Sequence, residues 1–131
     1  MGGGWGRLMK IRIKGNSIRY RLSKTEIANF RKNGYLEEIT EFPNGPCFYY
    51  RLERNNEIEN LEASFSDNRI CITVPGKIAD EWTTTDIVGY DHKMKIGEEK
   101  ELFLLIEKDF VCLDHTLEDQ SDNYENPNKV C

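Results

Sequence analysis

The stretch MKIRIKGNSIRYRL, residues 9–22, constrains the fold of this chain more than any other segment. It has the pattern of a β-hairpin whose two-residue turn is Gly15-Asn16, and such a turn sets the cross-strand pairs by counting outward. The count gives the ribbon one apolar side and one cationic side. The apolar side consists of Met9, Ile11, Ile13, Ile18, Tyr20 and Leu22.

The cationic side of this hairpin needs a compensating charge. Arg12 faces Arg19, and Lys10 faces Arg21. Like charges directly opposite each other destabilise a sheet. We therefore expect an anion over this side, either from the chain itself or from a ligand. The candidate anion-binding residues are Lys10, Arg12, Arg19 and Arg21.

Charge is distributed unevenly along the chain, whose net charge is −5. Residues 1–32 carry nine Lys/Arg and one acid, and the remaining residues carry nine Lys/Arg and 22 acids. This basic patch in an acidic chain fits internal charge compensation, an anionic small molecule or an acidic protein surface. Nucleic acid is disfavoured because the bulk charge repels phosphate away from the patch.

The order of the predicted elements indicates the fold class. A second hairpin is expected over 61–74, and a central strand over 101–110 should be covered on both sides. A capping box at 23–26 predicts a helix over 24–33, and residues 75–82 suit a second short helix. Strands are also expected over 35–42, 47–54 and 87–90, with a polar connection over 91–100. The class is α+β, mainly antiparallel, with two short helices and no internal repeat; the sheet could curl into a half-barrel.

The domain boundaries follow from composition. Residues 1–8 are expected to be a flexible leader with Met9 as the start, and residues 9–131 a single domain. From Asp114 the chain carries five acids and one lysine without helix or strand periodicity. We expect this acidic segment, residues 114–131, to be extended and docked on the domain. No apolar run is long enough for a membrane helix and no secretion signal is visible, so a cytoplasmic location is expected.

Motifs for catalysis and cofactors are missing. The chain has no Walker loop, dinucleotide fingerprint or nucleophile elbow, so no cofactor and no catalytic residue is expected. His92 and His115 are expected to be solvated, and the four cysteines lack the close spacing of a zinc site. The acidic segment offers weak metal candidates, yet the sixth position of an EF-hand loop would be Asp119 instead of glycine. These candidates are Asp114, Glu118, Asp119 and Asp122.

Several blocks resemble a family of short uncharacterised bacterial proteins. They are MKIRIKGNSIRYRL, VPGKIADEW with the following VGY, FLLIEKDFVCLD, and EDQSDNYENPN ending in Cys131. The resemblance covers residues 9–131, which implies that the acidic segment is part of the domain and that residues 1–8 are not. The family carries no assigned activity, so the resemblance implies no catalytic or binding residues.

The function that these features favour is a non-catalytic binding or interaction module with a cationic hairpin face, either monomeric or homodimeric. The alternative is a phosphohydrolase for polyphosphate or a nucleotide, similar to the triphosphate-tunnel enzymes, whose barrels hold polyphosphate with Lys and Arg. Their opening E-x-E-x-K motif is absent, because residues 10–14 read KIRIK. Without those acids a catalytic metal has no ligands there.

Overall fold

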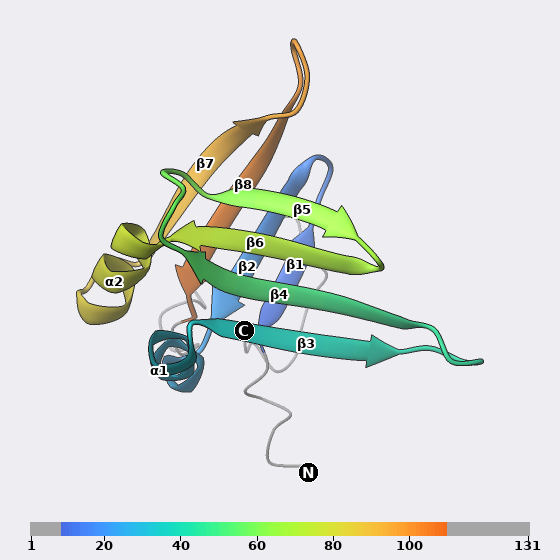
Figure 1. Cartoon of the computed structure of the whole chain (residues 1–131), viewed down its shortest axis with the longest axis horizontal. Helices are drawn as coiled ribbons and strands as arrows, with labels where there is room; N and C mark the ends of the chain where they lie inside the picture. Colours follow the sequence, from blue (N-terminus) through green and yellow to red (C-terminus); the bar gives the residue numbers. More distant parts are fainter. Residues whose placement is uncertain (1–8, 110–131) are drawn as a thin grey trace, which may run out of the picture.

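The computed structural model describes residues 9–109, so the predicted leader, the acidic segment and the weak metal candidates lie outside the described residues. Eight strands and two short helices make up this part (Figure 1), and the α+β class is confirmed. The elements are β1 Lys10–Ile13, β2 Ser17–Leu22, α1 Lys24–Asn33, β3 Tyr35–Glu41, β4 Cys47–Asn55, β5 Glu62–Ser66, β6 Arg69–Pro75, α2 Gly76–Thr84, β7 Gly89–Lys95 and β8 Glu101–Lys108.

The strands form two four-stranded sheets. We call β1-β2-β8-β7 sheet A and β3-β4-β6-β5 sheet B. Each sheet consists of two antiparallel hairpins whose inner strands pair in parallel, β2 with β8 and β4 with β6. Antiparallel pairs therefore predominate, as expected, but the parallel joints and the division into two separate sheets were not predicted.

The two halves of the chain repeat one arrangement. Strands β1–β4 with α1, and strands β5–β8 with α2, each read hairpin, helix, hairpin. If each strand of one half is replaced by its counterpart in the other half, such as β1 by β5 and β8 by β4, the strand order of sheet A becomes that of sheet B. The sequence analysis found no internal repeat, whereas the structure shows one in the order of the strands and helices.

The first hairpin has the predicted register. Lys10 pairs with Arg21 and Arg12 with Arg19 across β1 and β2. Gly15 takes a φ of 55°, which glycine adopts without a steric penalty. The second hairpin also turns where expected, at two residues with positive φ, Asp67 and Asn68.

Local signals set both ends of α1. The Ser23 hydroxyl accepts a hydrogen bond from the Glu26 amide, and the Glu26 carboxylate accepts one from the Ser23 amide. This is the predicted capping box. The helix ends at Gly34 in the left-handed conformation, with φ 83°. Helix α2 continues two residues beyond the predicted end, to Thr84.

The prediction for residues 87–100 was wrong. The strand begins at Gly89 and continues to Lys95, through part of the segment expected to be a polar connection. His92 thus lies on a strand. Tyr90, His92 and Met94 alternate with exposed polar residues and are half-buried. This alternation is typical of a strand with one buried face, and the charged residues between them obscured it.

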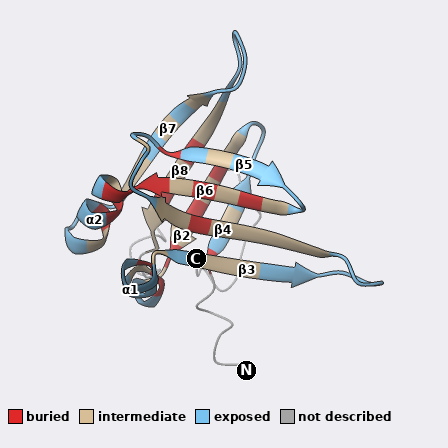
Figure 2. Cartoon of the chain, viewed as in Figure 1, coloured by how far each residue is buried: buried red, intermediate tan, exposed pale blue. Residues whose placement is uncertain are grey.

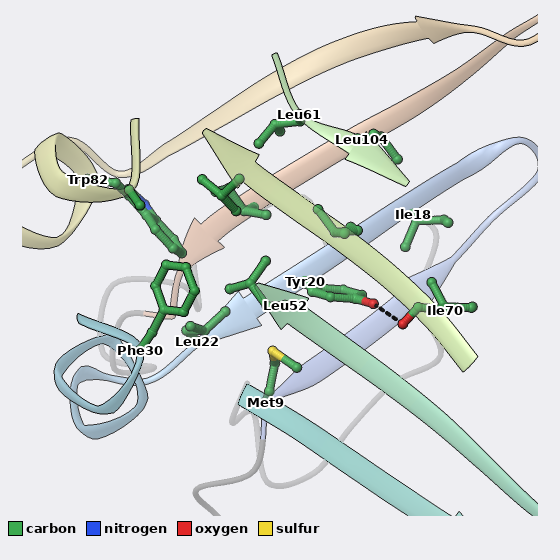
Figure 3. Close-up of a cluster of buried hydrophobic side chains, with 14 residues drawn as sticks. Met9, Ile18, Tyr20, Leu22, Phe30, Leu52, Leu61, Ile70, Trp82 and Leu104 are labelled. Atoms are coloured by element: carbon green, nitrogen blue, oxygen red, sulfur yellow. Dashed lines mark hydrogen bonds between the residues drawn. The ribbon is translucent and has the colours of Figure 1, made fainter. Parts of the chain in front are cut away.

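The core fills the space between the two sheets (Figures 2 and 3). The Tyr20 hydroxyl of β2 donates to the Ile70 carbonyl of β6 over 3.2 Å, which links sheet A to sheet B. At the end where the helices lie, Trp82 of α2 packs edge-on against Phe30 of α1 with ring centroids 6.2 Å apart. Both rings are almost fully buried, so they close this end of the core.

Glu26 makes stability depend on pH. Its Oε2 is buried without a hydrogen-bond partner among the described residues, and burial, with the charges of Glu38 and Asp109, raises the pKa of its carboxyl. The folded state then holds this proton more tightly than the unfolded chain, so the contribution of Glu26 to stability falls as pH rises above its ordinary pKa of 4.5. We expect Glu26→Gln to gain stability relative to the parent chain as pH rises from 4 to 7.

Urea unfolding of both chains across this pH range measures the effect. The side-chain oxygen of the glutamine can still accept the hydrogen bond from the Ser23 backbone NH. If the glutamine side chain lowers the stability of the folded state, it does so by the same amount at every pH. A stability difference that stays constant between pH 4 and pH 7 would contradict the assignment of a raised pKa to Glu26.

Candidate anion-binding site

The four predicted cations share the outer face of sheet A, the face that points away from sheet B. The strand register groups the side chains of this face into rows that cross the sheet. One row is Lys10, Arg21, Glu107 and Gly89; the next is Arg12, Arg19, Leu105 and Asp91; a third is Ser17, Phe103 and Lys93.

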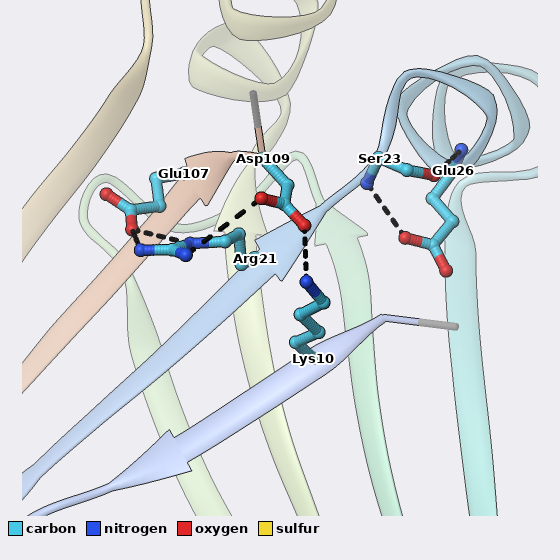
Figure 4. Close-up of polar contacts among 6 residues, drawn as sticks. All are labelled: Lys10, Arg21, Ser23, Glu26, Glu107 and Asp109. Atoms are coloured by element: carbon cyan, nitrogen blue, oxygen red, sulfur yellow. Dashed lines mark hydrogen bonds and ion pairs between the residues drawn. The ribbon is translucent and has the colours of Figure 1, made fainter. Parts of the chain in front are cut away.

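The chain supplies acids to the first row from the end of β8 (Figure 4). Lys10 Nζ lies 2.8 Å from Asp109 Oδ2. The Arg21 guanidinium donates through Nε and Nη2 to Glu107 Oε2 over 3.0 and 2.9 Å. The same carboxylate lies 3.4 Å from Arg19. Internal compensation is therefore present at this end of the face, although it comes from residues that the sequence analysis assigned to the central strand.

The end of this face near the turn between β1 and β2, the hairpin end, has fewer acids than the row of Lys10 and Arg21. Within residues 9–109, Arg12 and Lys14 make no ion pair, and both are exposed. A recess of about 220 Å³ lies between Arg12, Lys14, Arg19 and the strand β8. A second recess of about 270 Å³ extends along the same cations toward Lys10. Cations therefore line both recesses.

The floor of the first recess is apolar. Phe103 and Leu105 of β8 line it and are half-buried, whereas the core-facing Leu104 and Ile106 are fully buried. The expectation that this strand is covered on both sides is not met in the described part of the chain, where both helices lie at one end of the sheets (Figure 1). An aromatic floor between cations suits a ligand that has both charged and apolar parts.

Sheet B offers an internal comparison, because its outer face also carries two arginines. Arg69 Nε lies 2.6 Å from Glu37, and Arg51 Nε lies 2.6 Å from Glu53. Each guanidinium also stacks on a tyrosine ring, at 4.4 Å for Arg51 and 4.5 Å for Arg69. Both arginines of sheet B are therefore satisfied by their own sheet, which distinguishes them from Arg12 on sheet A.

The other residues considered for chemistry do not form a site. The described residues contain no cluster of three or more His, Cys, Asp or Glu side chains that could hold a metal ion. Cys47 and Cys71 are free and half-buried, and burial raises the pKa of the Cys71 thiol, which opposes reactivity. Cys112, Cys131 and His115 lie outside the described residues.

Gly89 is required where the site meets the edge of the sheet. A Cβ at this position would collide with the Ile106 carbonyl oxygen and would lie 2.9 Å from the Glu107 Cβ. We expect Gly89→Ala to lower the free energy of unfolding by about 1–3 kcal/mol, the usual cost of overpacking. Urea denaturation measures this loss. Gly97→Ala is the control, because its Cβ would have no neighbour closer than 3.7 Å.

Sequence reasoning identified the four cations but missed their surroundings. Lys14, Ser17, Phe103 and Leu105 line the recess, and Glu107 and Asp109 compensate part of the charge. The missing information is the parallel pairing of β2 with β8, which joins segments about 85 residues apart. The spacing of Phe103, Leu105 and Glu107 along one strand did indicate that their side chains share a face, since alternate residues of a strand point the same way.

Together, the strands and helices of the described residues define a two-sheet α+β fold. The chain belongs to the family of unknown function DUF7009, whose model matches residues 9–128. The resemblance found in the sequence is thereby confirmed. Neither the curated proteins nor the solved structures contain a match to this chain. None of the described helices has the length and apolar character needed to cross a membrane, and the cytoplasmic location stays a prediction.

Proposed function

We propose that this protein is a non-catalytic binding module that holds a phosphate-bearing anion on the outer face of sheet A. The ligand would lie in the recess at the hairpin end, with its phosphates between Arg12, Lys14 and Arg19. Lysine and arginine both bind phosphate well, and arginine adds a planar pair of donors. Phe103 and Leu105 would contact the less polar part of the ligand.

One observation carries this proposal. Arg12 and Arg19 lie directly opposite each other, an arrangement that costs stability, and within residues 9–109 Arg12 has no acid to offset it. On sheet B the corresponding face compensates every arginine with its own glutamates. A like-charge pair beside a recess is expected where an external anion binds.

The phosphohydrolase alternative has less support. In a tunnel enzyme the cations point into the barrel, whereas here the space between the sheets is filled by apolar side chains and the cations face outward. The sheets are also separate instead of closing on each other. These features favour binding over hydrolysis.

Titration of the full chain with a panel of anions tests the proposal. We expect tripolyphosphate and ATP to raise the melting temperature more than orthophosphate or sulfate, because a longer anion reaches more of the three cations. Ligand at 100 times its Kd stabilises the folded state by about 2.7 kcal/mol. Calorimetric titration of the same anions gives the affinities directly.

Three outcomes would contradict this proposal. The absence of any response across the panel would exclude a phosphate site. A response to polyglutamate without a response to phosphates would assign the face to an acidic protein partner. Release of orthophosphate from tripolyphosphate with Mg²⁺, abolished by Arg19→Ala, would establish the phosphohydrolase alternative.

A further inference from the structure

The last described residue, Asp109, lies beside β2 and places its carboxylate near Lys10 on the outer face of sheet A. The Asp109 amide donates to the Leu22 carbonyl over 2.8 Å, so the chain still runs beside β2 at this point. The Asp109 carboxylate lies 2.8 Å from Lys10 Nζ, across the neighbouring strand (Figure 4). The described part of the chain therefore ends at the row of Lys10 and Arg21.

The acidic segment has the charge and the reach to cover this face. It carries five acids and one lysine within residues 114–131. The row of Arg12 and Arg19 lies two residues along the strand from the row of Lys10 and Arg21, which is about 7 Å. Asp114 follows Asp109 by five residues, which span up to about 17 Å when extended. Glu118 can reach Lys14 by the same reasoning.

The surface itself suits a peptide with mixed character. Phe103 and Leu105 are half-buried between the cations, and they offer apolar contact to side chains such as Leu117 and Tyr124. The matched family model extends to residue 128, so it includes most of the acidic segment. A segment that continues the ion pairs already made by Glu107 and Asp109 would offset the charge left at Arg12.

We propose that the acidic segment, residues 114–131, docks along the outer face of sheet A and competes with the phosphate-bearing ligand for it. This regulatory role rests on the proposed function. Each exposed ion pair contributes little stability by itself, so a polyphosphate that engages several cations at once can displace the segment. The bound segment lowers the apparent affinity in proportion to the fraction of chains in which the face is covered.

Carbodiimide cross-linking of the full chain tests the docking, because this reagent couples lysine amines to carboxylates in contact with them. We expect mass spectrometry to find links from Lys14 and Lys93 to acids of the acidic segment, within one chain, and to find them reduced by saturating tripolyphosphate. Lys24 on α1 and Lys77 on α2 are the controls, since both are exposed but lie off this face.

The cross-links also identify other occupants. Equal linking of the acidic segment to Lys14 and Lys77 would overturn the docking. So would links that form between isotopically labelled and unlabelled chains, because they would place a second copy on the face. If the chain binds tripolyphosphate but shows no cross-link from Lys14 to the acidic segment, the docking is refuted and the proposed function is not. If the cross-link forms but tripolyphosphate does not bind, the proposed function is refuted and the docking is not.

A full-length variant with neutral residues in the acidic segment measures the competition. We expect replacement of its five acids by Asn or Gln to tighten tripolyphosphate binding by about 3- to 10-fold. This is the change expected when the segment covers the face in most chains of the parent protein and in few chains of the variant. The matched control neutralises five exposed acids elsewhere, so its net charge is identical: Glu41, Glu57, Glu59, Glu62 and Asp86. Equal tightening in both variants would show a long-range charge effect and overturn the competition.

Discussion

Replacing Arg12 and Arg19 together by alanine is expected to weaken tripolyphosphate binding on the order of 100-fold. Hydrogen bonds to charged groups contribute about 1.5–3 kcal/mol each, and the lower value applies to these accessible side chains. Two such losses give about 3 kcal/mol, or roughly 100-fold in Kd. Calorimetric titration of the double variant measures the change.

The same double variant should remain folded. It removes a like-charge pair from opposite strands together with the contact between Arg19 and Glu107, so its melting temperature should stay close to that of the parent chain. Arg51→Ala/Arg69→Ala is the matched control, because it removes the same two charges from sheet B. Equal loss of binding in the two double variants would contradict the site on sheet A.

Trp82→Ala is expected to lower the free energy of unfolding by about 3–5 kcal/mol, the usual range for a buried large aromatic residue. Trp82 is fully buried, packs on Phe30, and donates through its indole NH to the Val88 carbonyl over 3.0 Å. Its removal opens a cavity where both helices meet the core. A domain of this kind has about 5–15 kcal/mol of stability in total, so the loss is a large part of it.

Urea unfolding measures this cost, and Phe42→Ala provides the comparison. Phe42 is 52% exposed, so its truncation should change stability by less than about 0.5 kcal/mol. If Trp82→Ala proved as mild as Phe42→Ala, the helices would not close the core in the manner described.

Local chemistry made part of this fold predictable. The Gly15-Asn16 turn fixes the first register because a two-residue loop allows one pairing, and the Ser23–Glu26 capping box fixes the start of α1. The parallel pairing of β2 with β8 was not predictable, since no turn or spacing relates strands that lie so far apart in the chain. Strand β7 was predicted only over 87–90, because the charged residues of its second half resemble those of a loop.

The candidate site was predictable to the same extent. Alternation along the first hairpin placed Arg12 and Arg19 on one face, because residues two apart in a strand point the same way. What lies beside them depends on the neighbouring strand, so Phe103 and Glu107 could be assigned to this face only after the sheet order was known.

The most direct test of the site is a ¹⁵N–¹H NMR titration of the full chain with tripolyphosphate. We predict that the largest amide shift changes occur around Arg12, Lys14, Ser17, Arg19 and Phe103, on the outer face of sheet A. The amides around Arg51 and Arg69 on sheet B should change little. The largest changes on sheet B, or a spectrum that does not respond to the ligand, would contradict the assignment of an anion-binding surface to sheet A.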